Sequence, residues 1–157
     1  MRALVQRVAK ASVDIDGEFG SEINKGLLIF LGISKSDTNS DIEYVVDKSV
    51  NLRVFPDVNG KFHFSVRDIK GELMVISQFT LYGDTRRGRR PSFTDAMEPV
   101  AAEKVFDKVV DMFKSYSGLT ISEGQFGSHM DIKSINDGPV TIWLDSEDLV
   151  QPRKVVS

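Results

Sequence analysis

The feature that most restricts the fold of this chain is the stretch of residues 26–33, which contains no polar side chain. A strand with one face in water alternates apolar and polar residues, whereas a strand covered on both faces is apolar throughout. We therefore predict a central strand here. A second apolar run, residues 73–76, predicts another core strand, and the chain must cover both faces of the sheet that contains them.

The remaining strands are predicted from alternation and turn signals, and they cover residues 2–9, 11–16, 62–66, 119–123, 130–135 and 140–144. Asp16-Gly17 and Asn59-Gly60 are the strongest turn signals. His63 lies between Phe62 and Phe64, so we expect it to face solvent.

Two segments with helical spacing of apolar residues predict helices over residues 40–52 and 95–116. Ser40 and Glu43 suit a capping box at the start of the first helix. Pro99 is compatible only with the first turn of the second helix, and Gly118 ends it.

This order of elements predicts an α/β fold: a single domain over residues 1–157 with two packed, barrel-like β-layers covered by helices on one side. Residues 146–157 are expected to form a C-terminal tail, of which residues 151–157 fray.

Composition excludes several kinds of site and partner. Without cysteine the chain has no thiol nucleophile and no thiolate metal site, and its two histidines, His63 and His129, match no metal motif, so we expect no metal and no cofactor. No apolar run approaches the roughly 18 residues of a membrane helix, which predicts a cytoplasmic protein with no membrane partner. The net charge of −3 argues against non-specific coating of nucleic acid.

The run at residues 73–76 ends in the polar sequence Ser77-Gln78-Phe79-Thr80-Leu81. Hydroxyls, an amide and unpaired backbone N–H groups at a strand exit suit a catalytic site. The same residues also suit an ordinary turn.

Four arginines, Arg86, Arg87, Arg89 and Arg90, fall within five positions of the following loop. They predict either a solvated loop or a clamp for phosphate, whose oxygens match the guanidinium fork.

A further distinctive stretch is Asn136-Asp137-Gly138-Pro139-Val140-Thr141, where Gly138-Pro139 predicts a turn between two strands. Frequencies of proline isomers favour a trans peptide bond there. In the first strand, Gln6 and Arg7 interrupt the apolar pattern, so Arg7 either faces solvent or holds a specific acceptor. Trp143 is expected to be a core or interface aromatic.

Residues 77–81 and 136–141 together resemble the paired signatures of the D-aminoacyl-tRNA deacylases, and residues 2–8 and 90–93 extend the resemblance over nearly the whole chain. The resemblance implies the deacylase-family fold. It also implies an enzyme that hydrolyses the ester between a D-amino acid and the 3′-terminal adenosine of tRNA, as proofreading in translation.

The resemblance further implies a homodimer with active sites at the subunit interface. Gly138 and Pro139, joined by a cis bond, would enter the partner's site as a chiral filter, with Gln6 and Arg7 in support. Phe126 and Met130 would contact the terminal adenine.

Within the catalytic stretch Ser77 to Thr80, two mechanisms compete. Either Thr80 forms an acyl-enzyme, or the N–H groups around Phe79 and Thr80 stabilise the oxyanion while water attacks with help from the RNA 2′-hydroxyl. The sequence offers Thr80 no adjacent base, which favours the second mechanism. The rival function is a non-catalytic tRNA-binding module, in which the four arginines grip phosphate. A serine-triad hydrolase lacks its nucleophile elbow.

Overall fold

The structure is a computed structural model that describes residues 1–150. The segment predicted to fray, residues 151–157, lies outside this range. Among the described residues, no helix is long and apolar enough to cross a membrane.

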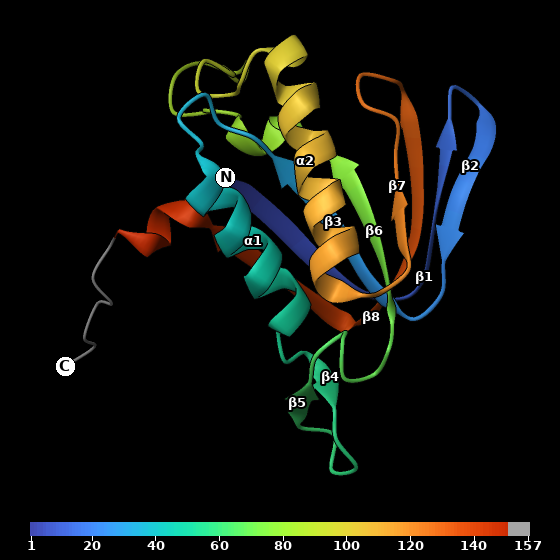
Figure 1. The fold of residues 1–157 in the computed structure, drawn as a ribbon. Helices are drawn as coiled ribbons and strands as arrows, with labels where there is room; N and C mark the ends of the chain where they lie inside the picture. The colour runs from blue at the N-terminus through green and yellow to red at the C-terminus, as the bar shows by residue number, and fades with distance from the viewer. Residues whose placement is uncertain (151–157) are drawn as a thin grey trace.

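A six-stranded sheet forms the centre of the molecule (Figure 1). Its strands are β1 (Arg2–Ile15), β2 (Glu18–Ile23), β3 (Gly26–Gly32), β6 (Glu72–Ser77), β7 (Ile121–Glu123) and β8 (Met130–Asp145). Strand β1 pairs with β8 along one edge and with β3 and then β2 along the other, all antiparallel. Strands β3, β6 and β7 run parallel to one another, and the sheet curves into a nearly closed, barrel-like shape.

The central strand β3 is buried on both faces, as predicted. Leu27, Ile29 and Leu31 belong to the large core cluster beneath the helices. Leu28 points the other way, into a smaller cluster with Val8 and other residues of β1, β6 and the start of β8. The two clusters are the two sides of the curved sheet, which confirms the expected barrel-like α/β architecture.

Residues 2–15 form one strand, so the predicted division into residues 2–9 and 11–16 is wrong. On one edge of β1 the partner changes from β3, whose first residue lies opposite Val8, to β2, whose last residue lies opposite Ala11. On the other edge β8 stays paired on both sides of this point and holds the strand together.

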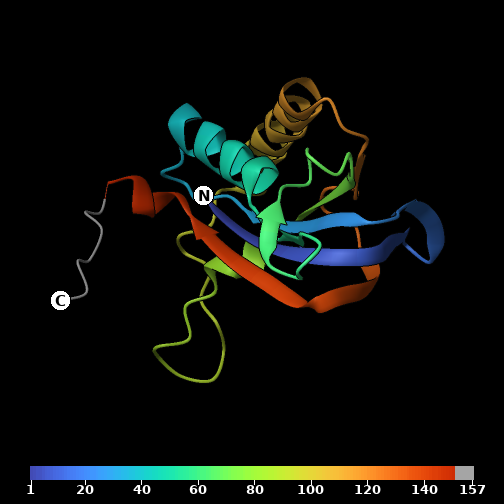
Figure 2. The same cartoon turned by 90° about the horizontal axis from the view of Figure 1, so that it is seen from below.

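Two helices, α1 (Asn39–Asn51) and α2 (Pro99–Ser117), lie on the same side of the sheet (Figure 2). Helix α1 is capped at Thr38, two residues earlier than predicted, and the N–H and hydroxyl of Thr38 both donate to Asp41 at 2.7 Å. Helix α2 begins at Pro99, so the predicted start at residue 95 is wrong; the residue before a proline is biased to extended backbone. It ends at Gly118, whose φ of 66° is left-handed, as predicted.

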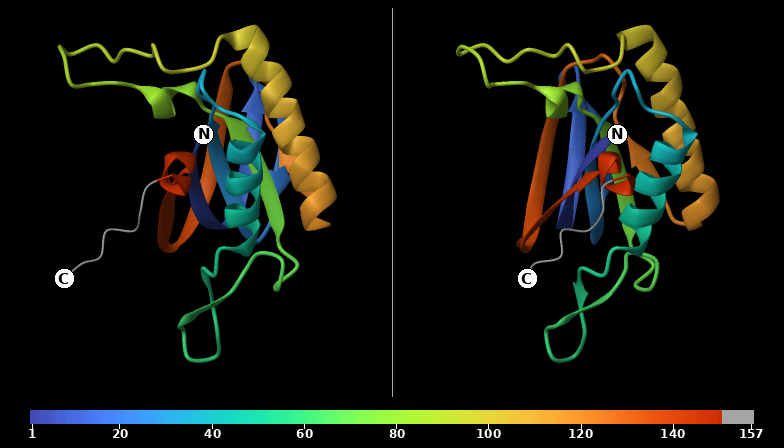
Figure 3. Two further views of the ribbon diagram at one scale, coloured as in Figure 1. Left: turned by 60° about the vertical axis from the view of Figure 1, so that its left-hand side comes forward. Right: turned by 90° about the vertical axis from the view of Figure 1, so that its left-hand side faces the viewer.

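Two segments project from the body (Figure 3). One is the hairpin of β4 (Phe55–Pro56) and β5 (Phe62–Phe64). All three residues of β5 are exposed, so His63 faces solvent as predicted. Phe62 and Phe64 are exposed too, because the hairpin stands away from the core. The other is the arginine-rich arm, residues 83–93, whose base is closed by backbone hydrogen bonds between Asp84 and Ser92.

Candidate active site

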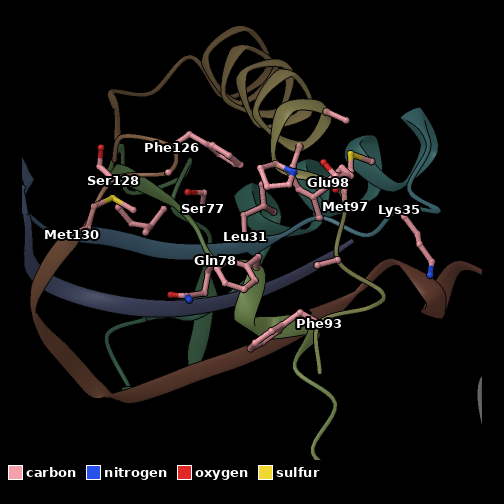
Figure 4. Close-up of a pocket in the computed structure, with 18 of the residues that line it drawn as sticks. Leu31, Lys35, Ser77, Gln78, Phe93, Met97, Glu98, Phe126, Ser128 and Met130 are labelled. Atoms are coloured by element: carbon pink, nitrogen blue, oxygen red, sulfur yellow. The ribbon is translucent and has the colours of Figure 1, made fainter. Parts of the chain in front are cut away.

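A cleft of about 1010 Å³ opens where β3 and β6 end, beneath the first turn of α2 (Figure 4). It brings together segments that are far apart in sequence. Its lining includes Leu31, Ser77, Gln78, Phe79, Phe93, Phe126, His129 and Met130. Two of the sequence signals, the exit of β6 and the predicted adenine contacts, therefore lie in one cleft.

The polar sequence after β6 folds into a short 3-10 helix, η1 (Phe79–Tyr82), where the sequence alone left a turn or a site open. Gln78 closes the strand by donating its N–H to the Leu31 carbonyl at 2.7 Å. The next two N–H groups, those of Phe79 and Thr80, begin the turn and have no earlier carbonyl of η1 to bind. Within residues 1–150 neither has a protein acceptor, so the turn offers two adjacent backbone donors, the first of them on Phe79 in the wall of the cleft.

The hydroxyls of this stretch have no base beside them. The Thr80 hydroxyl accepts a short hydrogen bond from the Gln78 side chain, and among the described residues neither it nor the Ser77 hydroxyl contacts a carboxylate or an imidazole. His129 does line the cleft, a position that sequence reasoning missed because its only signal was its place beside Met130. Gln78 and Thr80 thus brace each other at the start of η1.

Gly32 lies directly beneath η1. A Cβ at Gly32 would come within 3.0 Å of the Leu81 Cβ, 3.1 Å of the Gln78 carbonyl oxygen and 3.2 Å of the Tyr82 ring. Glycine therefore allows the turn to pack against the end of β3. Tyr82 itself is buried, and this burial raises the pKa of its hydroxyl.

Arg2 ties η1 to the end of β8. Its Nη1 donates to the Leu81 carbonyl at 3.1 Å and its Nε to Asp145 at 2.9 Å. The guanidinium also lies 4.4 Å from the centre of the Tyr82 ring, within range of a cation–π interaction. Sequence reasoning assigned no role to Arg2, because both partners come from distant parts of the chain.

Phe126 and Met130 lie at the other end of the cleft from Phe93 (Figure 4). Phe126 is partly buried and packs against Phe106 of α2, with ring centroids 6.0 Å apart. An aromatic ring and a thioether, both reachable from the cleft, suit contact with a flat heterocycle.

Gly138 and Pro139 lie outside this cleft. Val8 pairs with Asn136 and Gln6 with Thr141, so residues 137–140 bulge out opposite the single residue Arg7. The predicted strands 130–135 and 140–144 are accordingly one interrupted strand, β8. The Gly138-Pro139 bond is cis, as the family resemblance implied, and the trans bond favoured by proline frequencies is wrong.

Arg7 holds this bulge. It is only 8% exposed, and its Nε donates to the Asp137 carbonyl at 2.8 Å while Nη1 donates to the Val54 carbonyl at 2.5 Å. The Asp137 carboxylate lies 3.5 Å from Nε. Of the two alternatives for Arg7, the specific acceptor is therefore the one found. Gln6 adds a weaker contact, 3.3 Å from its Nε2 to the Thr141 hydroxyl.

The four arginines of the arm are not equivalent. Arg86 is paired with Asp84 through two hydrogen bonds of 2.7 and 2.9 Å, which lower the pKa of Asp84 to about 2. Arg87, Arg89 and Arg90 are exposed, and none has an acidic partner within residues 1–150. The arm therefore carries three cations that are free to meet an anion.

Trp143 is 48% exposed, so it is not a core residue, and its role at an interface stays a prediction. Among the described residues, no cluster of three or more histidine, aspartate or glutamate side chains is arranged to hold a metal ion.

In sequence, the chain is similar to proteins of one family. The family model described as D-Tyr-tRNA(Tyr) deacylase matches residues 4–145. The D-aminoacyl-tRNA deacylase of Aquifex aeolicus is 52% identical over 149 residues, 95% of this chain and 100% of that protein. That of Thermosipho melanesiensis is 49% identical over 147 residues, 94% of this chain and 98% of that protein.

Solved structures give the same fold. One titled c-Myc DNA Unwinding Element Binding Protein has a TM-score of 0.88 at 41% identity and covers 92% of this chain and 98% of its own. A probable eukaryotic D-amino acid tRNA deacylase, at 11% identity, shares the fold with a TM-score of 0.79, covering 91% of this chain and 97% of its own. The chain belongs to the D-Tyr-tRNA(Tyr) deacylase family.

Proposed function

We propose that the cleft between η1 and α2 is the active site of a D-aminoacyl-tRNA deacylase. Membership of the family makes the chain a hydrolase that cleaves the ester bond between a D-amino acid and tRNA. The reaction releases the free D-amino acid and the tRNA. Removing the D-amino acid in this way is a proofreading step in translation.

The observation that carries the mechanism is the pair of free N–H groups of Phe79 and Thr80 beside hydroxyls that have no base. Water attacks the ester carbonyl carbon, and the two N–H groups stabilise the oxyanion that forms. The bond from that carbon to the 3′-oxygen of the terminal ribose then breaks, and the 3′-oxygen takes up a proton. Each such donor is worth roughly 2.7–4 kcal/mol in comparable sites.

Water needs a base, and the terminal 2′-hydroxyl of the RNA is the group nearest to the reacting ester in the substrate itself. We assign it the task of assisting the attack. Phe126 and Met130 hold the terminal adenine, and Ser77 and Thr80 act through shape and support.

The chiral filter comes from a second copy of the chain. Gly138 and Pro139 are exposed on a bulge that lies outside the cleft of their own chain, and Arg7 fixes that bulge from within. In a homodimer with its sites at the interface, the bulge of one subunit would enter the cleft of the other. Backbone that approaches the substrate Cα rejects an L side chain by direct clash, which discriminates sharply.

Arg87, Arg89 and Arg90 would contact tRNA phosphates, and Arg86 contributes less because Asp84 already neutralises it. We place the reaction in the cytoplasm, where translation supplies the substrate. We also propose that residues 1–157 act as one domain, with residues 146–157 as its tail.

The test compares hydrolysis of D-tyrosyl-tRNA, L-tyrosyl-tRNA and glycyl-tRNA by the same enzyme preparation. We expect the D and glycyl esters to be cleaved and the L ester to survive, because glycine has no side chain for the filter to reject. Glycyl-tRNA that stays intact would refute the steric filter. Binding of all three without any hydrolysis would instead favour the rival, a non-catalytic tRNA-binding module.

A further inference from the structure

We propose that Phe79 and Phe93 form a second nucleotide subsite, on which the base that precedes the terminal adenosine stacks. The inference rests on the proposed function, because it takes the 3′ end of tRNA as the ligand of the cleft. It adds a recognition element that the reaction itself does not require.

The two rings form an aromatic pair on the wall of the cleft, in which Phe79 is exposed and Phe93 is partly buried. Their centroids are 5.0 Å apart and their planes make an angle of 73°, and the side chain of Phe79 is 58% exposed. Phe93 packs against Gly83, where a Cβ would come within 3.2 Å of its ring. The pair is therefore held in place by the chain around it while ring surface stays open to a ligand.

The position of the pair fits a nucleotide next to the adenosine site. Phe93 lies at the opposite end of the cleft from Phe126 and Met130, with Ser77 and Gln78 between them (Figure 4). The amino acid leaves the terminal ribose at the 3′-oxygen and the preceding nucleotide at the 5′-oxygen, so a ligand whose terminal base lies at Phe126 and whose ester lies at η1 brings both groups to the part of the cleft that Phe93 lines. The charge near Phe93 decides between them. The arm, residues 83–93, rejoins the body at this end of the cleft, because Phe93 is its last residue.

The arm supplies the charge that identifies the ligand. The hydrogen bonds between Asp84 and Ser92, 2.7 and 2.9 Å, place the base of the arm directly beside Phe93. Beyond it stand Arg87, Arg89 and Arg90, in a chain whose net charge is −3. Aromatic rings next to a local cluster of cations are the combination that binds single-stranded nucleic acid. A neutral amino-acid side chain at Phe93 would gain no electrostatic attraction from these cations.

The test uses three D-tyrosyl esters that share the same scissile bond: D-tyrosyl-adenosine, the D-tyrosyl ester of the trinucleotide CCA, and D-tyrosyl-tRNA. For Phe93→Ala we expect kcat/KM to fall about 5- to 150-fold on the trinucleotide and the tRNA, which corresponds to the roughly 1–3 kcal/mol of stacking on one ring. On D-tyrosyl-adenosine, which has no preceding base, the change should stay within about twofold.

Two further variants distinguish a loss of base stacking from a loss of packing. Phe93→Trp keeps an aromatic face and should retain activity on all three esters, whereas Phe93→Leu keeps apolar volume and should behave like Phe93→Ala. Phe19→Ala is the matched control, because this phenylalanine is 67% exposed on β2 and lies outside the cleft. Replacing Arg87, Arg89 and Arg90 with glutamine should reduce the salt dependence of the tRNA reaction alone.

An equal loss on all three esters would overturn the proposal, since it would place the amino-acid side chain or the fold itself at Phe93. No loss on any ester would also overturn it. Failure of the proposed function gives a different result, in which the wild-type enzyme cleaves none of the three.

Discussion

Replacing Arg7 with lysine tests whether one buried guanidinium fixes the Gly138-Pro139 bulge. The guanidinium donates from two different nitrogens to two carbonyls on separate segments, Asp137 in β8 and Val54 before β4. A lysine ammonium keeps the charge, but it is a single point donor on a flexible stem, so it can serve one of these carbonyls and not both.

The magnitude follows from the bond that is lost. A hydrogen bond to a charged donor contributes about 1.5–3 kcal/mol. The Arg7 bond to the Val54 carbonyl is buried and the bond to the Asp137 carbonyl is partly buried, so water cannot fully replace the lost donor at either one. For a chain of this size each kcal/mol lowers the midpoint of thermal unfolding by about 2–4 °C, which gives a decrease of roughly 3–12 °C. The Asp137 carboxylate adds little, because its side chain is 49% exposed.

Thermal unfolding is measured together with the ratio of kcat/KM for D-tyrosyl-tRNA to that for L-tyrosyl-tRNA. Both the midpoint and the ratio should fall, since a loosened bulge no longer excludes the L side chain. Lys10→Met is the matched control, because Lys10 lies on the same strand in a half-exposed ion pair with Glu22 that contributes at most about 1 kcal/mol. If Arg7→Lys shifts the midpoint no more than this control and leaves the ratio unchanged, Arg7 does not hold the bulge.

Three further substitutions test other parts of the site. Thr80→Ala should keep substantial hydrolysis of D-tyrosyl-tRNA, since the Thr80 hydroxyl has no base beside it, while a substrate with hydrogen in place of the terminal 2′-hydroxyl should react far more slowly. Single-turnover rates measure both effects, and a loss above about a thousandfold for Thr80→Ala would favour the acyl-enzyme mechanism instead. Gly138→Ala should lower the free energy of unfolding by about 1–3 kcal/mol and impair the chiral filter, because φ of Gly138 is 146° and the new Cβ would come within 2.7 Å of Val140. The control Gly17→Ala has a φ of 87° but open space around it, so it should leave the ratio of kcat/KM for the D and L esters unchanged. Gly32→Ala should lower kcat with little change in KM, because its methyl group displaces η1 and not the adenine contacts; a change confined to KM would contradict this.

The sequence determined the features that depend on neighbouring residues. The apolar run at residues 26–33 could only be a strand covered on both faces, and it is. Pro99 and Gly118 set the ends of α2 because a proline and a left-handed glycine act within one helical turn. The paired motifs at residues 77–81 and 136–141 likewise identified the family without any structure.

Only the tertiary structure decided which distant residues each sequence motif contacts. The pattern around Arg7 could not name its acceptors, because they lie 47 and 130 positions away in the chain. The free N–H groups of Phe79 and Thr80 exist only because residues 79–82 leave the sheet as η1, which Gly32 and Arg2 hold from below and from the side. Backbone propensity is a local property, whereas a site is made by pairings between distant strands, and those are fixed only when the whole sheet closes.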